Sequence, residues 1–395
     1  MSRPFRLVII TGEASGDALA QRFLVALRQR LGDRPLELAG VGGHALIDQG
    51  LKPFFPQADI AVMGFGPVIA RLPLLLRRMK DAAKGTAEFK PDLLLTVDAP
   101  DFTLRVAQKL RRRAPSIPIV HWVCPTVWAW RSGRARRMVP HVDRILALLP
   151  FEPAALERLH GPKTVYVGHP VIERLGELRP DANEAARRAD SAAPDILVLP
   201  GSRRSEINHL MPVFGKAVVQ IAKAVPGARF LLPAVTHLRG LIAEQVAAWP
   251  VAPQLVDGEA AKYAAFRSAR AAIAASGTVT LELALAQVPT VAAYRGADWE
   301  AAIARRLIKL PTVILANLVA GRNVVPEFIQ QDLTADALAR ELLAVLAEGP
   351  AREAQLAGFR EIEKNMRSAG ASPAANAVEA TLALLAETAG SSASG

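Results

Sequence analysis

Short apolar runs alternate with longer amphipathic stretches along the first 170 residues of the chain. The apolar runs predict buried strands at 6–10, 37–41, 92–97, 117–123, 144–149 and 163–167. Apolar positions recur at helical spacing over 16–31 and 102–112. Strands that alternate with helices are typical of a parallel sheet covered by helices on both faces.

The same rhythm restarts after residues 179–195, which are rich in Pro, Asp, Asn and small residues and which we interpret as a linker. Further strands are predicted at 196–199, 229–232, 254–256, 271–275 and 290–293. Helices are predicted at 206–224, 236–247, 259–268, 279–286, 334–348, 351–368 and 374–388.

The predicted fold class is therefore α/β, with two Rossmann-like parallel-sheet domains that face each other across a cleft. We expect the first domain at 1–178 and the second at 196–348. The helices over 349–389 are expected to pack back on the first domain, and 390–395 to form a disordered tail.

Composition narrows the class of protein. The 395 residues are 51% hydrophobic and 22% charged, which suits two packed domains rather than a disordered chain. The single cysteine excludes a disulfide framework within the chain, and the seven histidines lack metal-ligand spacing, so we expect no metal. The net charge of +11 indicates an anionic partner: nucleic acid, anionic lipid or a phosphorylated substrate.

The apolar stretches are too short for a membrane span, and the first 11 residues read as a strand rather than a signal peptide. We therefore expect a cytoplasmic protein whose membrane contact, if any, is peripheral.

The segment TGEASGD (11–17) directly follows the first predicted strand. Its two glycines permit a tight turn and the close approach of a ligand. A helix start explains Ser15 as a cap and Asp17 as a charge that favours the helix dipole, but it leaves Glu13 unexplained. Both interpretations, a helix start and part of a binding site, stay open.

Two carboxylates close the strand at 92–97. An acid at a strand end that faces a cleft can serve as a general base. Asp101 is explained as the N-cap of the following helix, whereas Asp98 has no such role. We therefore predict Asp98 as the base.

Three of the five tryptophans gather in WVCPTVWAWR (122–131). Their flat amphipathic faces suit a sugar or an acyl chain, although core packing is the more common role of any single tryptophan. Clustering in a loop with a proline and basic residues favours a functional role. Cys124 is not predicted as a nucleophile, because no histidine and acid accompany it.

One loop of the second half suits a diphosphate. Gly201, Ser202 and Arg203 follow a predicted strand and open a helix, so they supply a tight turn, a hydroxyl, backbone amides and a guanidinium group. The alternative is an exposed helix cap with solvated arginines.

A second loop repeats this design with Ser276, Gly277 and Thr278. Glu282 follows in the next helix, where its carboxylate suits the hydroxyls of a ribose. Asn317 lies further on, in a predicted loop that could close on the same ligand.

The segment 63–80 is apolar with basic residues at its end, and it is too short and too charged to span a bilayer. It fits a segment that lies in a membrane interface, with arginine and lysine on anionic headgroups. A buried helix with a basic exposed edge explains it equally well. The residues predicted to contact the membrane are Phe65, Val68, Ile69, Leu72, Leu75, Leu76, Arg77, Arg78 and Lys80.

Ten short motifs in fixed order resemble the lipid-A-disaccharide synthases. They are GEASGD (12–17), VMGF (62–65), VDAPDF (97–102), PTVWAWR (125–131), LLPFE (148–152), VGHP (167–170), LPGSR (199–203), SGTVTLE (276–282), YR (294–295) and NLVAGR (317–322).

This resemblance implies the two-domain arrangement called GT-B and an inverting glycosyltransferase that needs neither metal nor cofactor. The implied reaction transfers 2,3-diacylglucosamine from UDP-2,3-diacylglucosamine to the 6-hydroxyl of 2,3-diacylglucosamine 1-phosphate. The products are UDP and a β-1′,6-linked tetraacyl disaccharide 1-phosphate, in lipid A biosynthesis.

The resemblance also implies roles for residues of this chain. Asp98 would deprotonate the acceptor hydroxyl. The UDP site would comprise Gly201, Ser202, Arg203, Ser276, Gly277, Thr278, Glu282 and Asn317. The acceptor side would comprise Glu13, Ser15, Asp17, Trp128 and Arg131.

The expected partners are the two acylated substrates and the anionic phospholipid surface of the inner membrane, without nucleic acid, for a monomer or a homodimer. Three alternatives remain. A UDP-N-acetylglucosamine 2-epimerase would need no acceptor, a nucleic-acid-binding protein would show steep salt dependence, and an inactive sugar-nucleotide sensor would tolerate loss of Asp98.

Overall fold

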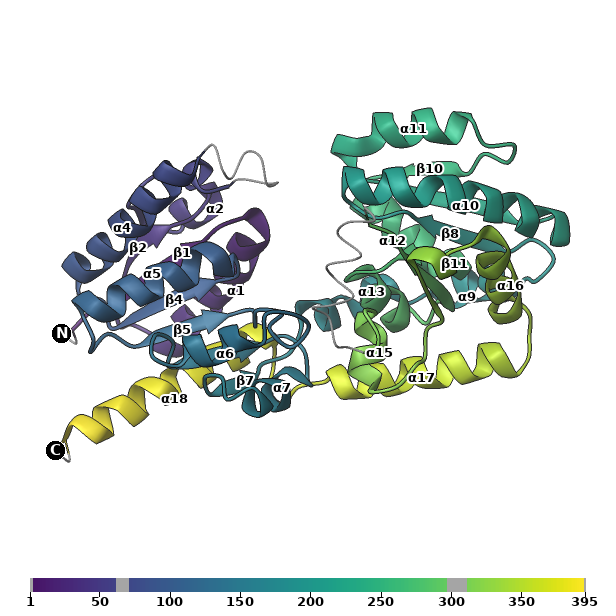
Figure 1. Cartoon of the computed structure of the whole chain (residues 1–395). Coiled ribbons are helices and arrows are strands. Elements are labelled where there is room, and N and C mark those ends of the chain that lie inside the picture. Colours follow the sequence, from purple (N-terminus) through teal and green to yellow (C-terminus); the bar gives the residue numbers. More distant parts are fainter. Residues whose placement is uncertain (1–2, 62–70, 297–310, 394–395) are drawn as a thin grey trace. The chain divides into compact units, whose positions relative to one another are not determined.

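The computed structural model describes residues 3–61, 71–296 and 311–393 (Figure 1). The chain divides into two compact units. One is formed by the residues up to His169 together with those from Ser368 onward, and the other by Pro170–Arg367. Each unit contains one parallel sheet with helices packed on it, which confirms the predicted fold class of two α/β domains.

The described part of the first unit has a seven-stranded parallel sheet in the order β3-β2-β1-β4-β5-β6-β7. Its strands are β1 Phe5–Thr11, β2 Leu36–Val41, β3 Lys52–Pro53, β4 Leu93–Val97, β5 Ile119–Trp122, β6 Arg144–Ala147 and β7 Thr164–Tyr166. Its helices are α1 Ala14–Leu31, α2 His44–Ile47, α4 Leu72–Phe89, α5 Pro100–Arg113, α6 Gly133–Met138, α7 Glu152–Arg158 and α18 Pro373–Ala393, with a 3-10 turn at Gln57–Asp59.

Alternate residues of each central strand face opposite layers of this unit. Leu7 and Ile9 of β1 pack with α1 and α18, whereas Val8 and Ile10 pack with α4 and α5. All five residues of β4 are buried. Burial on both faces explains why these strands are continuous apolar runs rather than alternating ones.

The described part of the second unit has a six-stranded parallel sheet in the order β10-β9-β8-β11-β12-β13. Its strands are β8 Asp195–Leu199, β9 Arg229–Ala234, β10 Gln254–Asp257, β11 Ala269–Ala275, β12 Thr290–Tyr294 and β13 Glu327–Ile329. Its α-helices are α8 Leu175–Leu178, α9 Ala182–Ala189, α10 Arg204–Ala224, α11 Arg239–Ala247, α12 Glu259–Ser268, α13 Val279–Leu285, α15 Leu315–Ala320, α16 Ala335–Leu346 and α17 Pro350–Met366. Short 3-10 turns lie at Pro170–Arg174, Thr236–Leu238 and Gln330–Asp332.

The linker predicted at 179–195 is instead a packed part of the second unit, which begins at Pro170. Asp181 caps α9 in a capping box with Glu184. This four-residue signature is easily missed in a segment whose overall composition is that of a linker. Glu184 also pairs with Arg267 of α12 at 2.8 Å. Arg188 donates hydrogen bonds to the carbonyl groups of Ala269 and Ala286.

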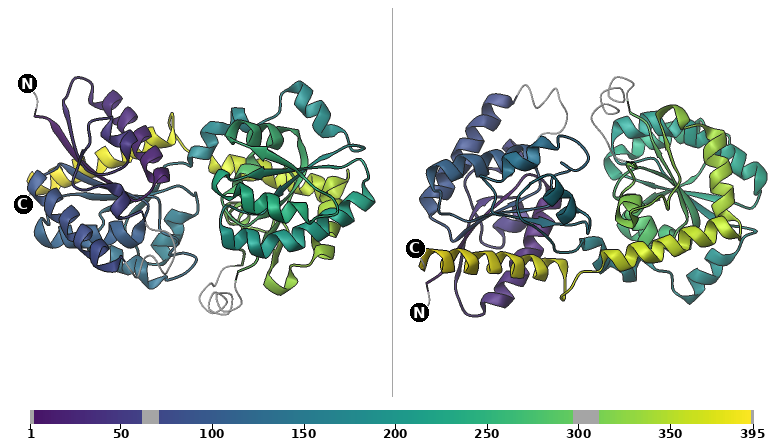
Figure 2. Two further views of the ribbon diagram at one scale, coloured as in Figure 1. Left: turned by 90° about the horizontal axis from the view of Figure 1, so that it is seen from above. Right: turned by 60° about the horizontal axis from the view of Figure 1, so that its bottom comes forward.

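The two C-terminal helices belong to different units, so the prediction that both pack on the first domain is half wrong. α17 packs on α13 and α15, and Gln355 bonds the backbone N–H and C=O of Thr290. α18 packs along the first unit, as predicted (Figure 2). Arg144 of β6 ties it there through Glu387 at 2.8 Å. The described helix continues to Ala393, where a disordered tail was expected from residue 390.

Candidate active site

In each sheet the strand order reverses beside the first strand of the unit. β1 lies between β2 and β4, and β8 lies between β9 and β11. Ligands of doubly wound sheets bind at the carboxyl ends of the strands that flank such a reversal. The loops after β1 and β4, and those after β8 and β11, are the loops in which the sequence places its candidate chemistry.

Asp98 lies at this position in the first unit. Thr11 pairs with Val97 at the ends of β1 and β4, so the loops that begin at Gly12 and Asp98 start side by side. The Asp98 carboxylate is half-buried and has no hydrogen-bond or ion-pair partner among the residues that the structure describes. It is therefore available to a substrate.

The backbone around Asp98 is held in an unfavourable conformation. Asp98 and Ala99 have φ angles of 53° and 45°, in the left-handed region that costs non-glycine residues on the order of 1–3 kcal/mol each. Two hydrogen bonds hold it there: the Asp98 N–H donates to the Trp122 carbonyl at 2.9 Å, and the Thr103 hydroxyl donates to the Asp98 carbonyl at 2.8 Å. Strained backbone of this kind is common at functional sites, which supports Asp98 as the carboxylate that acts as the base.

Gly12 makes the close approach of the two loops possible. A Cβ atom at Gly12 would lie 2.5 Å from the Cβ of Ala99, and one at Gly16 would lie 3.4 Å from the Val97 carbonyl oxygen. Gly12 is therefore explained by packing against the loop that carries Asp98, whereas a Cβ at Gly16 would make only ordinary van der Waals contacts.

The three acceptor-side residues of this motif have different environments. Glu13 occupies the N-cap of α1 with an exposed side chain that makes no capping bond, so it is available to a ligand. Ser15 is exposed in the first turn and is not the cap, because the helix begins one residue earlier, at Ala14. Asp17 is buried, and the predicted ligand contact is replaced by a structural role.

Asp17 connects three segments of the first unit. Its carboxylate accepts hydrogen bonds from the Thr11 hydroxyl, the Gly43 N–H at 3.2 Å and the Gln57 amide at 3.0 Å. These bonds join α1 to the end of β1, to the loop after β2 and to the 3-10 turn at Gln57–Asp59. Asp17 therefore positions the segment that carries Glu13.

Glu152 holds the tryptophan loop (122–131) in place, although the sequence had suggested no role for this residue. The Trp128 indole N–H donates to Glu152 Oε1 at 3.1 Å, and the Leu149 N–H donates to Oε2 at 2.9 Å. Trp128 also packs edge-on against Phe151. The LLPFE motif contains Glu152, so the signal was present in the sequence, but only the fold shows what it contacts.

The residues of this loop differ in exposure. Trp128 is half-buried and structural, whereas Trp130 is exposed and Arg131 stacks over its ring at 4.1 Å. Cys124 is buried, and burial together with the Glu152 carboxylate raises the pKa of its thiol far above the ordinary range. A thiol in that state is a poor nucleophile, in keeping with the prediction.

Glu152→Gln should flatten the pH dependence of stability between about pH 4.5 and 7. Burial raises the pKa of Glu152 from 4.5 to about 7, so the native state holds a proton that the unfolded chain releases in this interval. The stabilisation is complete below the unfolded pKa and is lost as pH rises through the folded pKa, by roughly 3 kcal/mol. Thermal unfolding across this interval should show the wild-type melting temperature falling relative to the variant.

Glu157→Gln on the same helix is the control for this experiment, because Glu157 is exposed. Its pH profile should match that of the wild type. Parallel profiles for Glu152→Gln and the wild type would show that Glu152 is ionised in the native protein.

In the second unit, the loop after β8 already holds a carboxylate. The N–H groups of Ser202 and Arg203 donate to Glu206 Oε2 at 3.0 and 3.2 Å, and the Arg203 guanidinium donates to Oε1 at 2.9 Å. Gly201 has a φ of 104°, and a Cβ there would lie 2.3 Å from Glu206 Oε2. The loop is thus a helix cap, as in the alternative interpretation, and the donors predicted for a diphosphate face an anion of the chain itself.

The loop after β11 is more open. Nothing lies within 4 Å of a Cβ built at Gly277, and Thr278 is exposed. The Ser276 hydroxyl donates to the Val313 carbonyl at 3.1 Å, and this bond fixes the position of the Ser276 side chain. Glu282 accepts a hydrogen bond from Lys262 of α12 at 2.6 Å. Lys262 is a candidate that sequence reasoning missed, since no local pattern joins it to Glu282.

Asn317 does not lie in a loop. It is fully buried in α15, where its amide donates to Val325 O at 2.9 Å and its carbonyl accepts from the N–H groups of Val324 and Val325. We therefore correct Asn317 from a ligand contact to a residue that positions the segment after α15.

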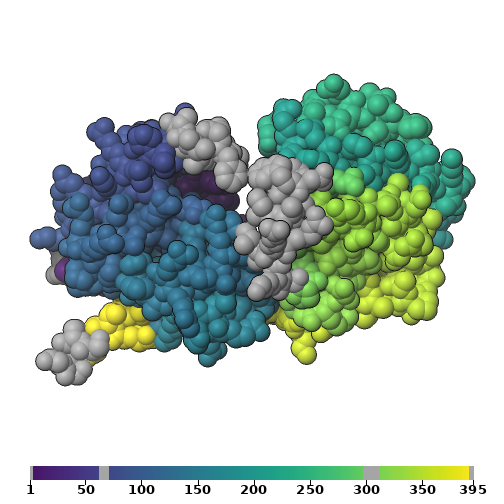
Figure 3. Space-filling view, viewed as in Figure 1, coloured from purple at the N-terminus to yellow at the C-terminus, as the bar shows by residue number. Residues whose placement is uncertain are grey.

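The predicted membrane segment is described only from residue 71, so Phe65, Val68 and Ile69 lie outside the described residues. α4 lies at the surface of the first unit (Figure 3) and exposes Leu72, Leu76, Arg77 and Lys80. Two predicted contacts are wrong. Leu75 is buried in the core, because it lies on the opposite face of the helix, and Arg78 pairs with Asp59 at 2.7 Å and with Asp81 at 3.0 Å. None of the described helices is long and apolar enough to cross a bilayer.

Solved structures share this fold at low sequence identity. A UDP-GlcNAc 2-epimerase from Neisseria meningitidis, bound to UDP-GlcNAc, aligns with 97% of this chain and 100% of its own at a TM-score of 0.57 and 13% identity. A glycosyltransferase from Rickettsia africae aligns with 98% of this chain and 99% of its own at a TM-score of 0.56 and 12% identity. The two parallel-sheet units therefore have the fold called GT-B, which this chain shares with these structures.

Sequence similarity is far stronger to one family. Residues 7–381 match the family described as lipid-A-disaccharide synthetase. A lipid-A-disaccharide synthase of Rhodopseudomonas palustris strain HaA2 is 50% identical over 380 residues, 96% of each chain. The synthase of Ruegeria pomeroyi is 41% identical, over 96% of this chain and 95% of its own. The chain belongs to the lipid-A-disaccharide synthetase family.

Proposed function

We propose that the protein transfers 2,3-diacylglucosamine from UDP-2,3-diacylglucosamine to the 6-hydroxyl of 2,3-diacylglucosamine 1-phosphate. The products are UDP and a β-1′,6-linked tetraacyl disaccharide 1-phosphate. The observation that carries this proposal is a family match that spans both units, with an unpaired Asp98 at the strand reversal of the first.

Asp98 acts as the general base in this reaction. It takes the proton of the acceptor 6-hydroxyl while the oxygen attacks the anomeric carbon of the donor, and the bond from that carbon to the UDP oxygen breaks. One displacement inverts the configuration, so a single base suffices and no covalent sugar–enzyme intermediate forms.

The second unit binds the nucleotide. The departing UDP gains negative charge, which the loop after β8 stabilises through Arg203, whose side chain is 78% exposed. Gly277 and Thr278 line the neighbouring loop. Glu282, which Lys262 holds in position, accepts hydrogen bonds from the ribose hydroxyls. In this proposal no metal takes part.

A product assay in detergent tests the proposal, with the diacylated donor and acceptor supplied together, the acceptor omitted, or EDTA added. Acceptor-dependent UDP release with a tetraacyl disaccharide phosphate product, unchanged by EDTA, is expected. UDP release without acceptor would assign the protein to the epimerases or hydrolases, and loss of turnover in EDTA would refute the metal-independent mechanism.

The exposed face of α4 binds the membrane surface in which both acylated substrates reside. Leu72 and Leu76 are 42% and 39% exposed and lie one turn apart, with Arg77 and Lys80 beside them. Apolar side chains flanked by basic ones suit an anionic bilayer interface.

Leu72→Asp with Leu76→Asp should lower co-sedimentation with anionic phospholipid vesicles at least tenfold, because each leucine contributes up to roughly 1.5–3 kcal/mol when it enters the membrane interface and the new charges repel the headgroups. Val25→Asp with Val139→Asp is the matched control, since both valines are also exposed in the first unit. Equal loss in both double variants would assign the effect to net charge rather than to α4.

A further inference from the structure

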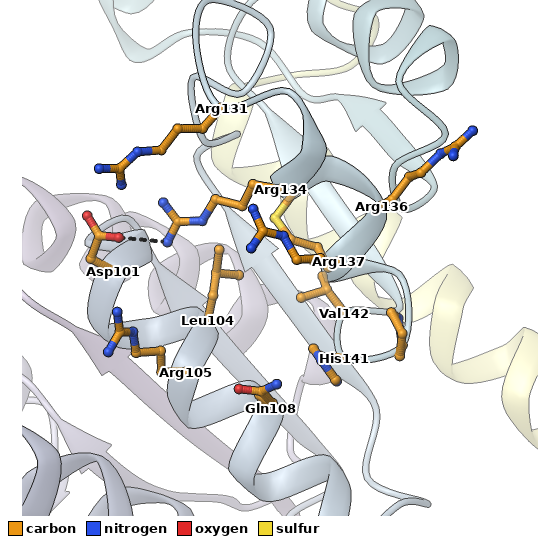
Figure 4. A pocket seen from close by; sticks show the side chains of 12 residues that line it. Asp101, Leu104, Arg105, Gln108, Arg131, Arg134, Arg136, Arg137, His141 and Val142 are labelled. Atoms are coloured by element: carbon orange, nitrogen blue, oxygen red, sulfur yellow. Dashed lines mark hydrogen bonds and ion pairs between the residues drawn. The ribbon is translucent and has the colours of Figure 1, made fainter.

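A groove of about 800 Å³ lies between α5 and α6 of the first unit. Leu104, Met138 and Val142 form apolar parts of its lining. Among the twelve lining residues, the charged ones are Asp101, Arg105, Arg131, Arg134, Arg136 and Arg137, which makes five guanidinium groups against one carboxylate. Figure 4 shows Arg105, Arg131, Arg134 and Arg137 extending over the groove, whereas Arg136 points away from it.

Only Arg134 of these arginines has a carboxylate partner among the described residues. Its guanidinium donates to Asp101 Oδ1 at 2.9 Å and to the Pro100 carbonyl at 2.8 Å (Figure 4). Arg137 donates to the Gly133 carbonyl at 3.2 Å, and Arg131 rests on the Trp130 ring. Cations that gather without counter-charges repel one another, and an anion in the groove relieves that repulsion.

An ordinary solvated basic surface is the alternative, and the geometry argues against it. Four of the five arginines line a concave space rather than spreading over a convex face. The Arg134 side chain is only 19% exposed and is fixed by two hydrogen bonds. Because its guanidinium group is already oriented, Arg134 loses little entropy when it binds an anion.

The groove adjoins the candidate base. Arg134 bonds Pro100 and Asp101, and Asp101 is three residues from Asp98, a stretch that spans at most about 11 Å. Arg131 lies in the loop after β5, and the carbonyl of Trp122, the last residue of β5, accepts a hydrogen bond from the Asp98 N–H. The groove therefore begins close to the loop that carries Asp98.

We propose that this groove binds the phosphate monoester of the acceptor sugar, with Arg105, Arg131, Arg134 and Arg137 as its ligands. The inference rests on the proposed function. The acceptor carries its phosphate on carbon 1 and its reacting hydroxyl on carbon 6, which are connected through the ring oxygen and carbon 5, so both groups can contact one region of the protein. A monoester bears up to two negative charges and three terminal oxygens, which suits several forked guanidinium donors better than a phosphodiester does.

The kinetic test uses Arg105→Gln with Arg137→Gln. Both side chains are exposed and neither has a carboxylate partner among the described residues, so the fold should persist. The KM for the phosphorylated acceptor should rise at least tenfold, with little change in the KM for the UDP-sugar. Arg113→Gln with Arg158→Gln removes the same charge from exposed positions outside the groove and should leave both constants within about twofold.

A binding test separates this proposal from the proposed function. Glucosamine 1-phosphate and glucosamine are titrated into the full-length protein by calorimetry. The wild type and the control should prefer the phosphorylated sugar, and the groove variant should lose that preference. If the protein showed this preference but no transferase activity, the phosphate site would be supported and the proposed function refuted. If transfer were normal and the groove variant kept the preference, only the phosphate site would be refuted.

Two further measurements distinguish other phosphate sources. Inorganic phosphate should compete with glucosamine 1-phosphate only weakly, because it lacks the sugar ring; equal affinity would make the groove a general phosphate site. Anionic phospholipid vesicles should bind the groove variant and the control equally. A selective loss of vesicle binding in the groove variant, with acceptor affinity unchanged, would reassign the groove to lipid headgroups and overturn the proposal.

Discussion

Asp98→Asn should lower kcat for sugar transfer by roughly two to four orders of magnitude, while the affinity for UDP stays within about twofold. The carboxylate lies at the strand reversal of the first unit, and no described residue bonds it. An amide of the same shape keeps the loop and its backbone hydrogen bonds but cannot accept the hydroxyl proton. The loss should therefore fall on kcat rather than on donor binding.

Steady-state kinetics over a range of pH, with UDP titrated separately by calorimetry, measure both quantities. Asp33→Asn, at an exposed position of the same unit, controls for the loss of one charge and should retain wild-type rates. More than a tenth of wild-type turnover in Asp98→Asn would assign the base to another residue, and Glu13 would be the next candidate.

Gly12→Ala should lower activity by one to two orders of magnitude without a direct contact to the substrate. The new methyl group would lie 2.5 Å from the Cβ of Ala99, so one of the two loops has to move. Ala99 follows Asp98 directly, and a displacement of about 1 Å at a reacting group can cost on the order of a hundredfold in rate. Overpacking should also lower stability by roughly 1–3 kcal/mol.

The clash predicts its own rescue. Ala99→Gly removes the opposing Cβ at a residue whose φ of 45° glycine adopts readily, so Gly12→Ala with Ala99→Gly should recover most of the activity and stability. Gly240→Ala, where nothing lies within 4 Å of the new Cβ, should behave as the wild type. If the double variant were no better than Gly12→Ala alone, contact with Ala99 would not be the cause of the defect.

Much of the fold could be predicted from the sequence because both sheets are parallel and buried. Their central strands are unbroken apolar runs, and the helices between them show the 3.6-residue repeat. The predicted strands at 6–10, 92–97 and 271–275 match β1, β4 and β11 to within two residues at each end. β3 and β13 were missed, because they are two and three residues long and their composition does not distinguish them from loops.

The unit boundaries could not be read in this way. Residues 179–195 have the composition of a linker, yet α9 is held by Arg188 and Glu184 through partners about 80 residues away in the chain. α17 and α18 are both amphipathic, and neither sequence shows which sheet it covers. Contacts between distant segments decided each case.

The sequence by itself determined the central strands, the longer helices of the second unit, the two-sheet class and the loops that carry the candidate residues, since apolar period and turn residues are local properties. The strand order was decided only by the tertiary structure, because parallel pairing joins β1 to β4 and β8 to β11 across many residues of chain. Folding also decided which side chains are available to a ligand. Asp98 has no partner among the described residues, whereas Asp17 and Asn317 form hydrogen bonds within the protein. Residue type and spacing name a candidate, but burial and hydrogen-bond partners, which arise only when distant segments pack together, decide whether it can reach a ligand.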